Sequence, residues 1–153
     1  LTLGMDRKVI VSGAVLKFPK QNCLIIDAGS CITYDFVDEN KNYFGGAISP
    51  GIEMRYKALN NYTAKLPRLD TEEPDSYIGN STNQSIHSGV VNGVVYEIEG
   101  FINDYLRENK YLTIILTGGD ALFLAKRFKN PIFANSNFLL ESLNLLYQYN
   151  IQW

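Results

Sequence analysis

The amino-acid sequence predicts a mixed α/β domain built on a three-stranded antiparallel meander. Two observations support this fold class. Three strand-like runs follow one another between residues 22 and 49, and helical and strand-like patterns alternate from residue 52 onward. This order is typical of a mixed sheet covered by helices. The chain has 153 residues, of which 46% are hydrophobic and 20% charged, as expected for one globular domain.

The meander is predicted by alternation and by polar turns. Strands are expected at residues 23–27, 31–38 and 43–49. The second alternates apolar and polar side chains from Ile32 to Phe36, as a half-buried strand does. Pro50-Gly51 ends the third strand. Residues 6–16, ahead of the meander, are consistent with either a strand or a helix, and Asp6 would cap a helix there.

Helical spacing dominates the rest of the chain. Helices are expected at 52–64, 83–108, 120–128 and 137–149, and strands at 112–117 and 131–134. Residues 67–82 form a loop that contains two prolines. The long helix includes Gly89, Gly93 and Gly100. Because glycine destabilises a helix interior by about 1 kcal/mol relative to alanine, these glycines indicate that another backbone approaches the helix.

Charge and hydropathy exclude several classes of function. The formal net charge is −2 and Lys and Arg form no block, so there is no electrostatic footprint for nucleic acid or an acidic membrane. The apolar runs are too short to span a bilayer. Cys23 and Cys31 lie in strand-like runs and are expected to be reduced core residues, which predicts a cytoplasmic location. One histidine and two cysteines do not favour a zinc site.

Four short polar motifs interrupt the apolar pattern, at residues 4–7, 27–30, 79–82 and 117–120. Glycine lets backbone N–H groups approach a phosphate, hydroxyls donate to phosphate oxygens, and carboxylates hold cations that neutralise phosphate charge. Each motif alone also fits a plain structural role, such as a helix cap at 4–7 or a strand-to-helix turn at 117–120. His87 is expected at a surface or interface rather than as a catalytic base.

Together and in this order, the motifs resemble the type III pantothenate kinases, a family also described as Bvg accessory factor-like. The matching stretches are "LGMDR", "IIDAGSCITYDFVD", "FGGAISPGIEM", "IGNSTNQSIHSGVVNG" and "ILTGGDA". The resemblance runs from Leu3 to about Tyr147. It implies the ribonuclease H-like fold shared by sugar kinases, actin and heat-shock ATPases, with two related domains. Residues 21–153 resemble the second actin-like ATPase domain, and residues 1–20 a lead-in helix that carries the first motif.

The resemblance also implies a role for each motif. The implied substrate-binding residues are Gly4, Met5, Asp6, Arg7 and Thr82, and the implied ATP-binding residues are Gly29, Ser30, Gly118 and Gly119. Asp6 would be the proton acceptor. Asp27 would hold a monovalent cation, K⁺ or NH₄⁺. The family usually has threonine where this chain has Ser30, but serine keeps the hydroxyl donor.

The implied activity is ATP-dependent phosphorylation of pantothenate to 4′-phosphopantothenate, the first step of coenzyme A biosynthesis, with Mg²⁺ accompanying ATP. Another small-molecule kinase of the superfamily and a noncatalytic transcription-accessory protein are the alternatives. Retention of Asp6, Asp27 and Thr82 favours the kinase. The family's N-terminal domain, with its own phosphate loop, has no counterpart in these residues, so the isolated chain is expected to have little kinase activity. Family members are homodimers whose sites involve both subunits, and Gly89 and Gly93 mark the expected contact.

Overall fold

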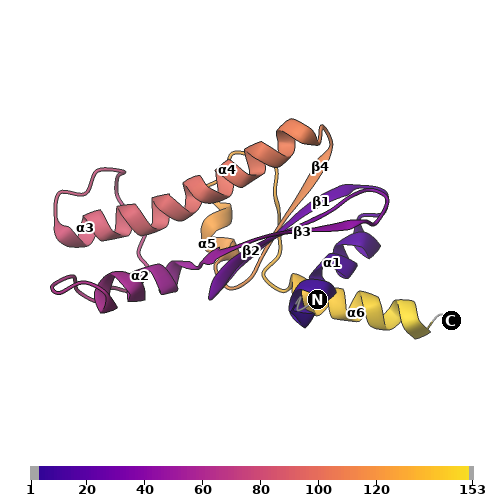
Figure 1. Cartoon of the computed structure of the whole chain (residues 1–153), viewed down its shortest axis with the longest axis horizontal. Coiled ribbons are helices and arrows are strands. Elements are labelled where there is room, and N and C mark those ends of the chain that lie inside the picture. Colours follow the sequence, from indigo (N-terminus) through magenta and orange to yellow (C-terminus); the bar gives the residue numbers. More distant parts are fainter. Residues whose placement is uncertain (1–3, 152–153) are drawn as a thin grey trace.

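A computed structural model describes residues 4–151, which form a five-stranded mixed sheet with helices on both faces (Figure 1). The strand order is β3-β2-β1-β4-β5. The antiparallel meander consists of β1 (Asn22–Ala28), β2 (Cys31–Val37) and β3 (Tyr43–Pro50). Two parallel strands extend it from β1, namely β4 (Leu112–Thr117) and then β5 (Phe133–Ala134). The predicted mixed α/β class and its meander are confirmed.

The helical elements are α1 (Met5–Lys17), α2 (Ile52–Asn61), α3 (Thr82–His87), the π-helical segment η1 (Ser88–Asn92), α4 (Gly93–Glu108), α5 (Ala121–Ala125) and α6 (Phe138–Ile151). The stretch at 6–16 is therefore a helix. Gly4 is its N-cap residue and Asp6 lies in its first turn, so the expected Asp6 cap is wrong. The helices predicted at 52–64 and 120–128 end earlier than expected, and the strand predicted at 131–134 shortens to β5.

β1 is apolar along most of its length because both of its faces are covered. Leu24 and Ile26 belong to a core shared with α2, α4 and α5, whereas Ile25 belongs to a second core shared with α1 and α6. Successive side chains of a strand point to opposite faces, so Asp27 lies on the same face as Ile25. Asp35 of β2 is the direct partner of Ile25 in the register, and it also faces α1. Two carboxylates of the sheet are thus directed toward the first helix.

The contact between α1 and α6 explains why position 13, which makes the pattern at 6–16 ambiguous, is a glycine. A Cβ atom at Gly13 would lie 1.9 Å from the Ser142 hydroxyl oxygen, so only glycine permits this approach of the two helices. The glycines of the long helix differ. A Cβ atom at Gly89, Gly93 or Gly100 would meet no other described atom within 4 Å. The close backbone contact that these glycines predict is not formed between residues 4 and 151 of this chain.

The predicted long helix is continuous from Thr82 to Glu108, but its middle is the π-helical segment η1. Ser88 and Asn92 are buried there. The Asn92 amide donates to the Ser88 hydroxyl at 3.1 Å, and this hydroxyl donates to the Tyr77 carbonyl oxygen at 2.7 Å. The segment therefore holds the preceding loop against the helix, a constraint that the helical periodicity does not reveal.

Two single residues differ from expectation. His87 is buried within the chain, which contradicts a surface position but does not test an interface, and its Nδ1 lies 2.8 Å from the Tyr56 hydroxyl. Cys23 is buried as expected. Cys31 is exposed, because it is the first residue of β2 and directly follows the loop between β1 and β2. Both cysteines are free thiols.

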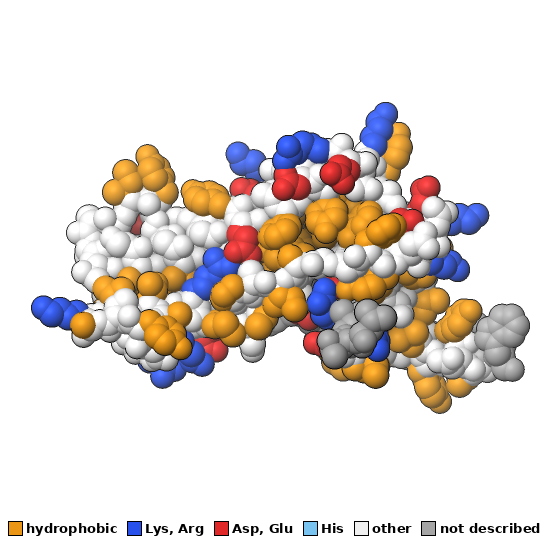
Figure 2. All heavy atoms as spheres, viewed as in Figure 1, with side chains coloured by type: hydrophobic (Ala, Val, Ile, Leu, Met, Phe, Trp, Pro, Cys, Tyr) orange, Lys and Arg blue, Asp and Glu red, His pale blue; other side chains and the backbone are white. Residues whose placement is uncertain are grey.

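The surface carries mixed charge. Figure 2 shows Lys and Arg interspersed with Asp and Glu over the visible face, and apolar side chains gathered between α4 and β3. A groove of about 620 Å³ in this region is lined by Phe36, Phe44, Phe101 and Tyr105, among others. Between residues 4 and 151, no helix combines the length and the apolar character needed to cross a membrane.

Candidate active site

The ends of β1, β3 and β4 bring three loops to one edge of the sheet. β1 and β4 are parallel, so the loops that follow them leave the sheet on the same side, and β3 ends beside the start of β2. Two backbone hydrogen bonds join these loops. The Asp120 N–H donates to the Ala28 carbonyl oxygen at 3.0 Å, and the Gly51 N–H donates to the Ser30 carbonyl oxygen at 3.1 Å. The motifs predicted at 27–30 and 117–120 therefore meet.

Gly118 lies directly against Asp27. Its φ is +96°, in the left-handed region that favours glycine. A Cβ atom at this position would lie 2.3 Å from the Ala28 carbonyl oxygen and 2.4 Å from Asp27 Oδ1. Gly119 is exposed, and a Cβ atom there would meet no described atom within 4 Å. Gly118 thus allows the loop to reach the carboxylate, whereas Gly119 faces open space.

Gly29 and Ser30 form the open side of the β1–β2 connection. A Cβ atom at Gly29 would meet nothing described within 4 Å, and Ser30 is exposed. Gly51 packs closely against the other side of this loop. A Cβ atom at Gly51 would lie 1.9 Å from the Gly29 carbonyl oxygen. The Ser30 hydroxyl is therefore accessible to a ligand at the edge where the three loops meet.

Asp6 is exposed in the first turn of α1. Its Oδ1 accepts the backbone N–H of Arg7 at 2.9 Å, and the side chain folds back over Gly4, where a Cβ atom would lie 2.4 Å from the same oxygen. Met5 is 71% exposed and contributes nothing to the core. The first motif thus presents a carboxylate at a helix N-terminus, where partial positive charge favours anions.

Arg7 points inward and contacts the buried Asp35. Its Nε lies 3.0 Å from each carboxylate oxygen of Asp35, and its Nη2 lies 2.7 Å from Oδ1. The Tyr43 hydroxyl donates to the same oxygen at 2.5 Å. The hydrogen bond to Asp35 raises the pKa of Arg7. Sequence reasoning missed Asp35 and Tyr43, although a carboxylate within a strand whose two faces are covered requires a partner.

The negative charge at this edge centres on the half-buried Asp27. Burial raises the pKa of Asp27, and the charges of Asp6 and Asp35 raise it further, so the first motif and β1 share one electrostatic environment. A monovalent cation would offset this charge, and carboxylate and backbone carbonyl oxygens are suitable ligands for it. The residues present therefore fit such a cation. Among residues 4–151, no group of three or more His, Cys, Asp or Glu side chains is arranged to hold a metal ion.

A polar pocket of about 300 Å³ lies beside the loop between β4 and α5. Its lining includes Tyr56, Lys57, Arg68 and Asp120. Burial raises the pKa of Asp120, and the charge of Glu53 adds to this effect. Groups of both signs in one pocket, next to Gly119, provide hydrogen-bond donors and acceptors for a polar ligand. The sequence pattern placed Asp120 in the motif but gave it no role.

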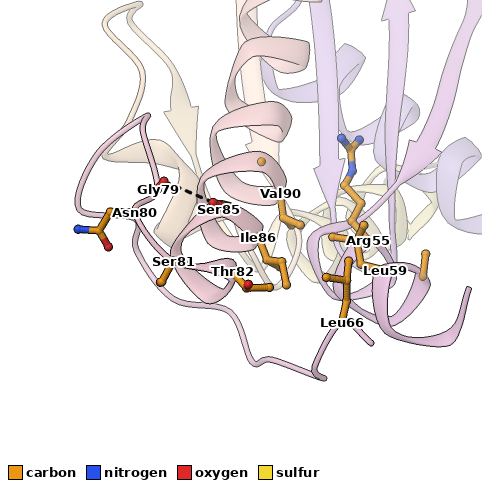
Figure 3. Close-up of a pocket in the computed structure, with 12 residues that line it drawn as sticks. Arg55, Leu59, Leu66, Gly79, Asn80, Ser81, Thr82, Ser85, Ile86 and Val90 are labelled. Carbon is orange, nitrogen blue, oxygen red and sulfur yellow. Dashed lines mark hydrogen bonds between the residues drawn. The ribbon is translucent and has the colours of Figure 1, made fainter. Parts of the chain in front are cut away.

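Thr82 does not belong to this edge of the sheet. It begins α3, and Figure 1 places α3 at one end of the long axis and α1 in the other half of the molecule. Thr82 lines a groove of about 1050 Å³ whose described lining includes none of the other predicted site residues. Figure 3 shows Thr82 and Ile86 facing Leu59 and Leu66 across this groove. Within one chain, Thr82 therefore lies apart from Asp6, and the groove that it lines does not include Asp27.

The structure shares its fold with a solved protein at low sequence identity. A crystal structure from Campylobacter jejuni, described as belonging to the Baf family, matches with a TM-score of 0.70 at 24% identity. The match covers 99% of this chain and 67% of that one. At this identity the likeness concerns the fold alone.

Sequence comparisons identify the family. The family description "type III pantothenate kinase" matches residues 1–104. The chain is 67% identical over 150 residues to the type III pantothenate kinase of Flavobacterium johnsoniae, and 69% identical over 148 residues to that of Flavobacterium psychrophilum. These alignments cover 98% and 97% of this chain but only 62% and 61% of the two relatives, so the chain spans about three fifths of their length. The chain belongs to the type III pantothenate kinase family.

Proposed function

We propose that this chain forms part of an enzyme that transfers the γ-phosphoryl group of ATP to the primary hydroxyl of pantothenate. The product would be 4′-phosphopantothenate, in the first step of coenzyme A biosynthesis. The observations that carry this proposal are the contact of Gly118 with Asp27 and the effect of the Asp6 charge on the pKa of Asp27, in a member of this family. Residues 21–153 would be the second of two actin-like domains, acting in the cytoplasm.

The nucleotide would bind where the three loops meet. Phosphoryl transfer depends mainly on alignment and on neutralisation of phosphate charge. Gly29 and Gly119 leave space for phosphates at this edge of the sheet, and the exposed Ser30 hydroxyl would be a donor to them. Asp27 would hold K⁺ or NH₄⁺, which, with the Mg²⁺ bound to ATP, offsets the phosphate charge. The pocket at Asp120 adjoins this loop and has the polar groups to bind a nucleoside.

Asp6 would accept the proton of the pantothenate hydroxyl as the new P–O bond forms. The hydrogen bond from the Arg7 N–H fixes one carboxylate oxygen and leaves lone pairs for the substrate. Since Asp6 is exposed at the start of α1, a substrate hydroxyl reaches it without displacing any core residue.

The direct test is ATP-dependent phosphorylation of pantothenate by the full-length protein, with potassium and with sodium. We expect product with potassium and about tenfold less with sodium, because oxygen ligands spaced for K⁺ would coordinate the smaller Na⁺ poorly. Asp27→Asn should lose this difference between the two ions. Phosphorylation of a sugar but not of pantothenate would favour another kinase of the superfamily, and the absence of any phosphoryl transfer would contradict the proposal.

We further propose that the enzyme is a homodimer in which Thr82 completes the pantothenate site of the second copy. The separation of Thr82 from Asp6 supports this arrangement, since both residues would contact one small substrate. Gly89, which is exposed on the same groove, leaves room for a neighbouring backbone.

Mixing two inactive variants tests the shared site. Asp6→Asn and Thr82→Ala, co-expressed in the full-length protein, are expected to regain about one quarter of wild-type activity. Half of the random dimers are mixed, and each has one intact site. The control pair is Asp6→Asn with Asp27→Asn, which should not exceed the residual activity of the two single variants, because both residues serve the same site of one copy. Failure of the first pair to exceed the control would place Thr82 outside the site.

A further inference from the structure

Asp35 is a buried carboxylate that takes no direct part in the proposed reaction. Asp35 is 2% exposed and lies on the face of β2 that α1 covers. A charged group in such a place is stable only when its oxygens are paired and hydrogen-bonded. Asp35 meets this requirement with Arg7, which forms a forked contact through Nε and Nη2, and with the Tyr43 hydroxyl.

Arg7 carries this contact to the start of α1. The N-cap residue, Gly4, has no side chain, so the first turn of the helix lacks a side-chain cap. The forked contact between Arg7 and Asp35, which are 28 residues apart in the chain, attaches this turn to the sheet instead. Asp6 immediately precedes Arg7 and accepts its backbone N–H at 2.9 Å. The direction of the Asp6 carboxylate therefore depends on where Arg7 is held.

Tyr43 completes the arrangement from the edge strand. Its hydroxyl lies 2.5 Å from Asp35 Oδ1, and Arg7 Nη2 lies 3.2 Å from the same hydroxyl. Tyr43 thus contacts both members of the ion pair and fixes their geometry. A guanidinium held by a carboxylate and a hydroxyl in this way has few rotamers available, which is the condition for precise placement of a neighbouring catalytic group.

We infer that Asp35 and Tyr43 are positioning residues, which hold Arg7 and through it place Asp6 for phosphoryl transfer. The expected effect of Asp35 and Tyr43 on catalysis rests on the proposed function. Their expected effect on the start of α1 does not. Arg7 is thereby assigned to the support of Asp6 rather than to direct binding of the pantothenate carboxylate.

The opposite face of the sheet provides a matched control. Glu97 accepts the Tyr34 hydroxyl at 2.8 Å and forms an ion pair with Arg55 at 2.5 Å, so it repeats the combination of carboxylate, tyrosine and arginine. Tyr34 is fully buried, so Tyr34→Phe removes a tyrosine–carboxylate bond at least as sheltered as that of Tyr43. It does not touch Arg7 or the loops of the candidate site.

The test compares Tyr43→Phe, Asp35→Asn and Tyr34→Phe in the full-length protein. We expect kcat to fall about threefold to tenfold in Tyr43→Phe and about 100-fold in Asp35→Asn, because a misplacement of about 1 Å costs that much. The KM values for pantothenate and ATP should stay within about twofold, and Tyr34→Phe should keep wild-type kcat. A rise in the pantothenate KM with unchanged kcat would overturn the inference, because Arg7 would then act on the substrate directly.

Amide hydrogen exchange of residues 8–11 gives a readout that needs no activity. These amides should exchange faster in Tyr43→Phe and Asp35→Asn than in the wild type, and should be unchanged in Tyr34→Phe. Equal exchange in Tyr43→Phe and Tyr34→Phe would refute the positioning role. If the wild-type protein proved unable to phosphorylate pantothenate, the proposed function would fail, and the exchange rates alone would decide whether Asp35 and Tyr43 fix the start of α1.

Discussion

Replacing Asp6 by asparagine is expected to lower kcat for pantothenate phosphorylation by about 10²–10⁴-fold, the usual contribution of a general base. The fold should not change, because asparagine keeps the side-chain oxygen that accepts the Arg7 N–H at 2.9 Å. The KM for ATP should also be unchanged, since the loops proposed to bind the nucleotide follow β1 and β4 rather than α1. Steady-state kinetics of the full-length variant, with unfolding in urea as the check on stability, measure each of these expectations.

Asp104→Asn is the matched control for this substitution. Asp104 is also an exposed helical aspartate, but it lies near the end of α4 and pairs only with Arg107 among the described residues. It should keep wild-type turnover. Equal, full activity in both variants would remove Asp6 from the reaction and with it the assignment of the first motif as the catalytic one.

Gly118→Ala is expected to damage both the fold and the nucleotide site. The new Cβ atom would lie 2.3 Å from the Ala28 carbonyl oxygen and 2.4 Å from Asp27 Oδ1, and the φ of +96° is unfavourable for alanine. Strain of this kind and overpacking against backbone together cost about 2–4 kcal/mol of unfolding free energy. Because the loop must also move away from Asp27, we expect the KM for ATP to rise at least about tenfold.

Gly119→Ala is the control variant, because it replaces a glycine of the same loop at which a Cβ atom would not contact Asp27. Its Cβ atom would meet no described atom within 4 Å, and its φ is not positive, so its unfolding free energy should change by less than about 1 kcal/mol. Urea unfolding and ATP titrations of the two variants measure the contrast. Similar losses in both would mean that the contact with Asp27 is not what requires glycine at position 118.

Much of the fold was predictable because local patterns report directly on covered faces. The run from Cys23 to Ile26 indicated a strand, and the structure covers both of its faces. The apolar spacing from Val90 to Ile102 indicated a helix against the sheet. The stretch at 6–16 was ambiguous because Gly13 weakens both patterns. Glycine is needed at this position because of the contact with Ser142 in α6, which is remote in sequence.

The candidate site was predictable only in part, for the same reason. The motifs that contain Asp27 and Gly118 are recognisable in the sequence because each interrupts an apolar pattern where a strand ends. The arrangement of the two at one edge follows from parallel pairing, which a sequence pattern suggests but does not specify. Asp35 escaped notice because alternation assigned it to an exposed face, whereas Arg7 and Tyr43 cover it. No local signal could show that Thr82 lies in a groove apart from Asp6.

The π-helical segment η1 determines how far α3 is rotated about the helix axis relative to α4. Each residue of an α-helix advances the chain by about 100° around the axis, and a π-helical segment adds one residue to a turn. The angular phase of Thr82 relative to α4 is therefore set by the number of residues between Ser88 and Asn92. Loss or gain of a single residue in this segment would rotate α3 by about a quarter turn while the packing of α4 stays in place, and would turn Thr82 relative to Leu59 and Leu66 on the other wall of the groove.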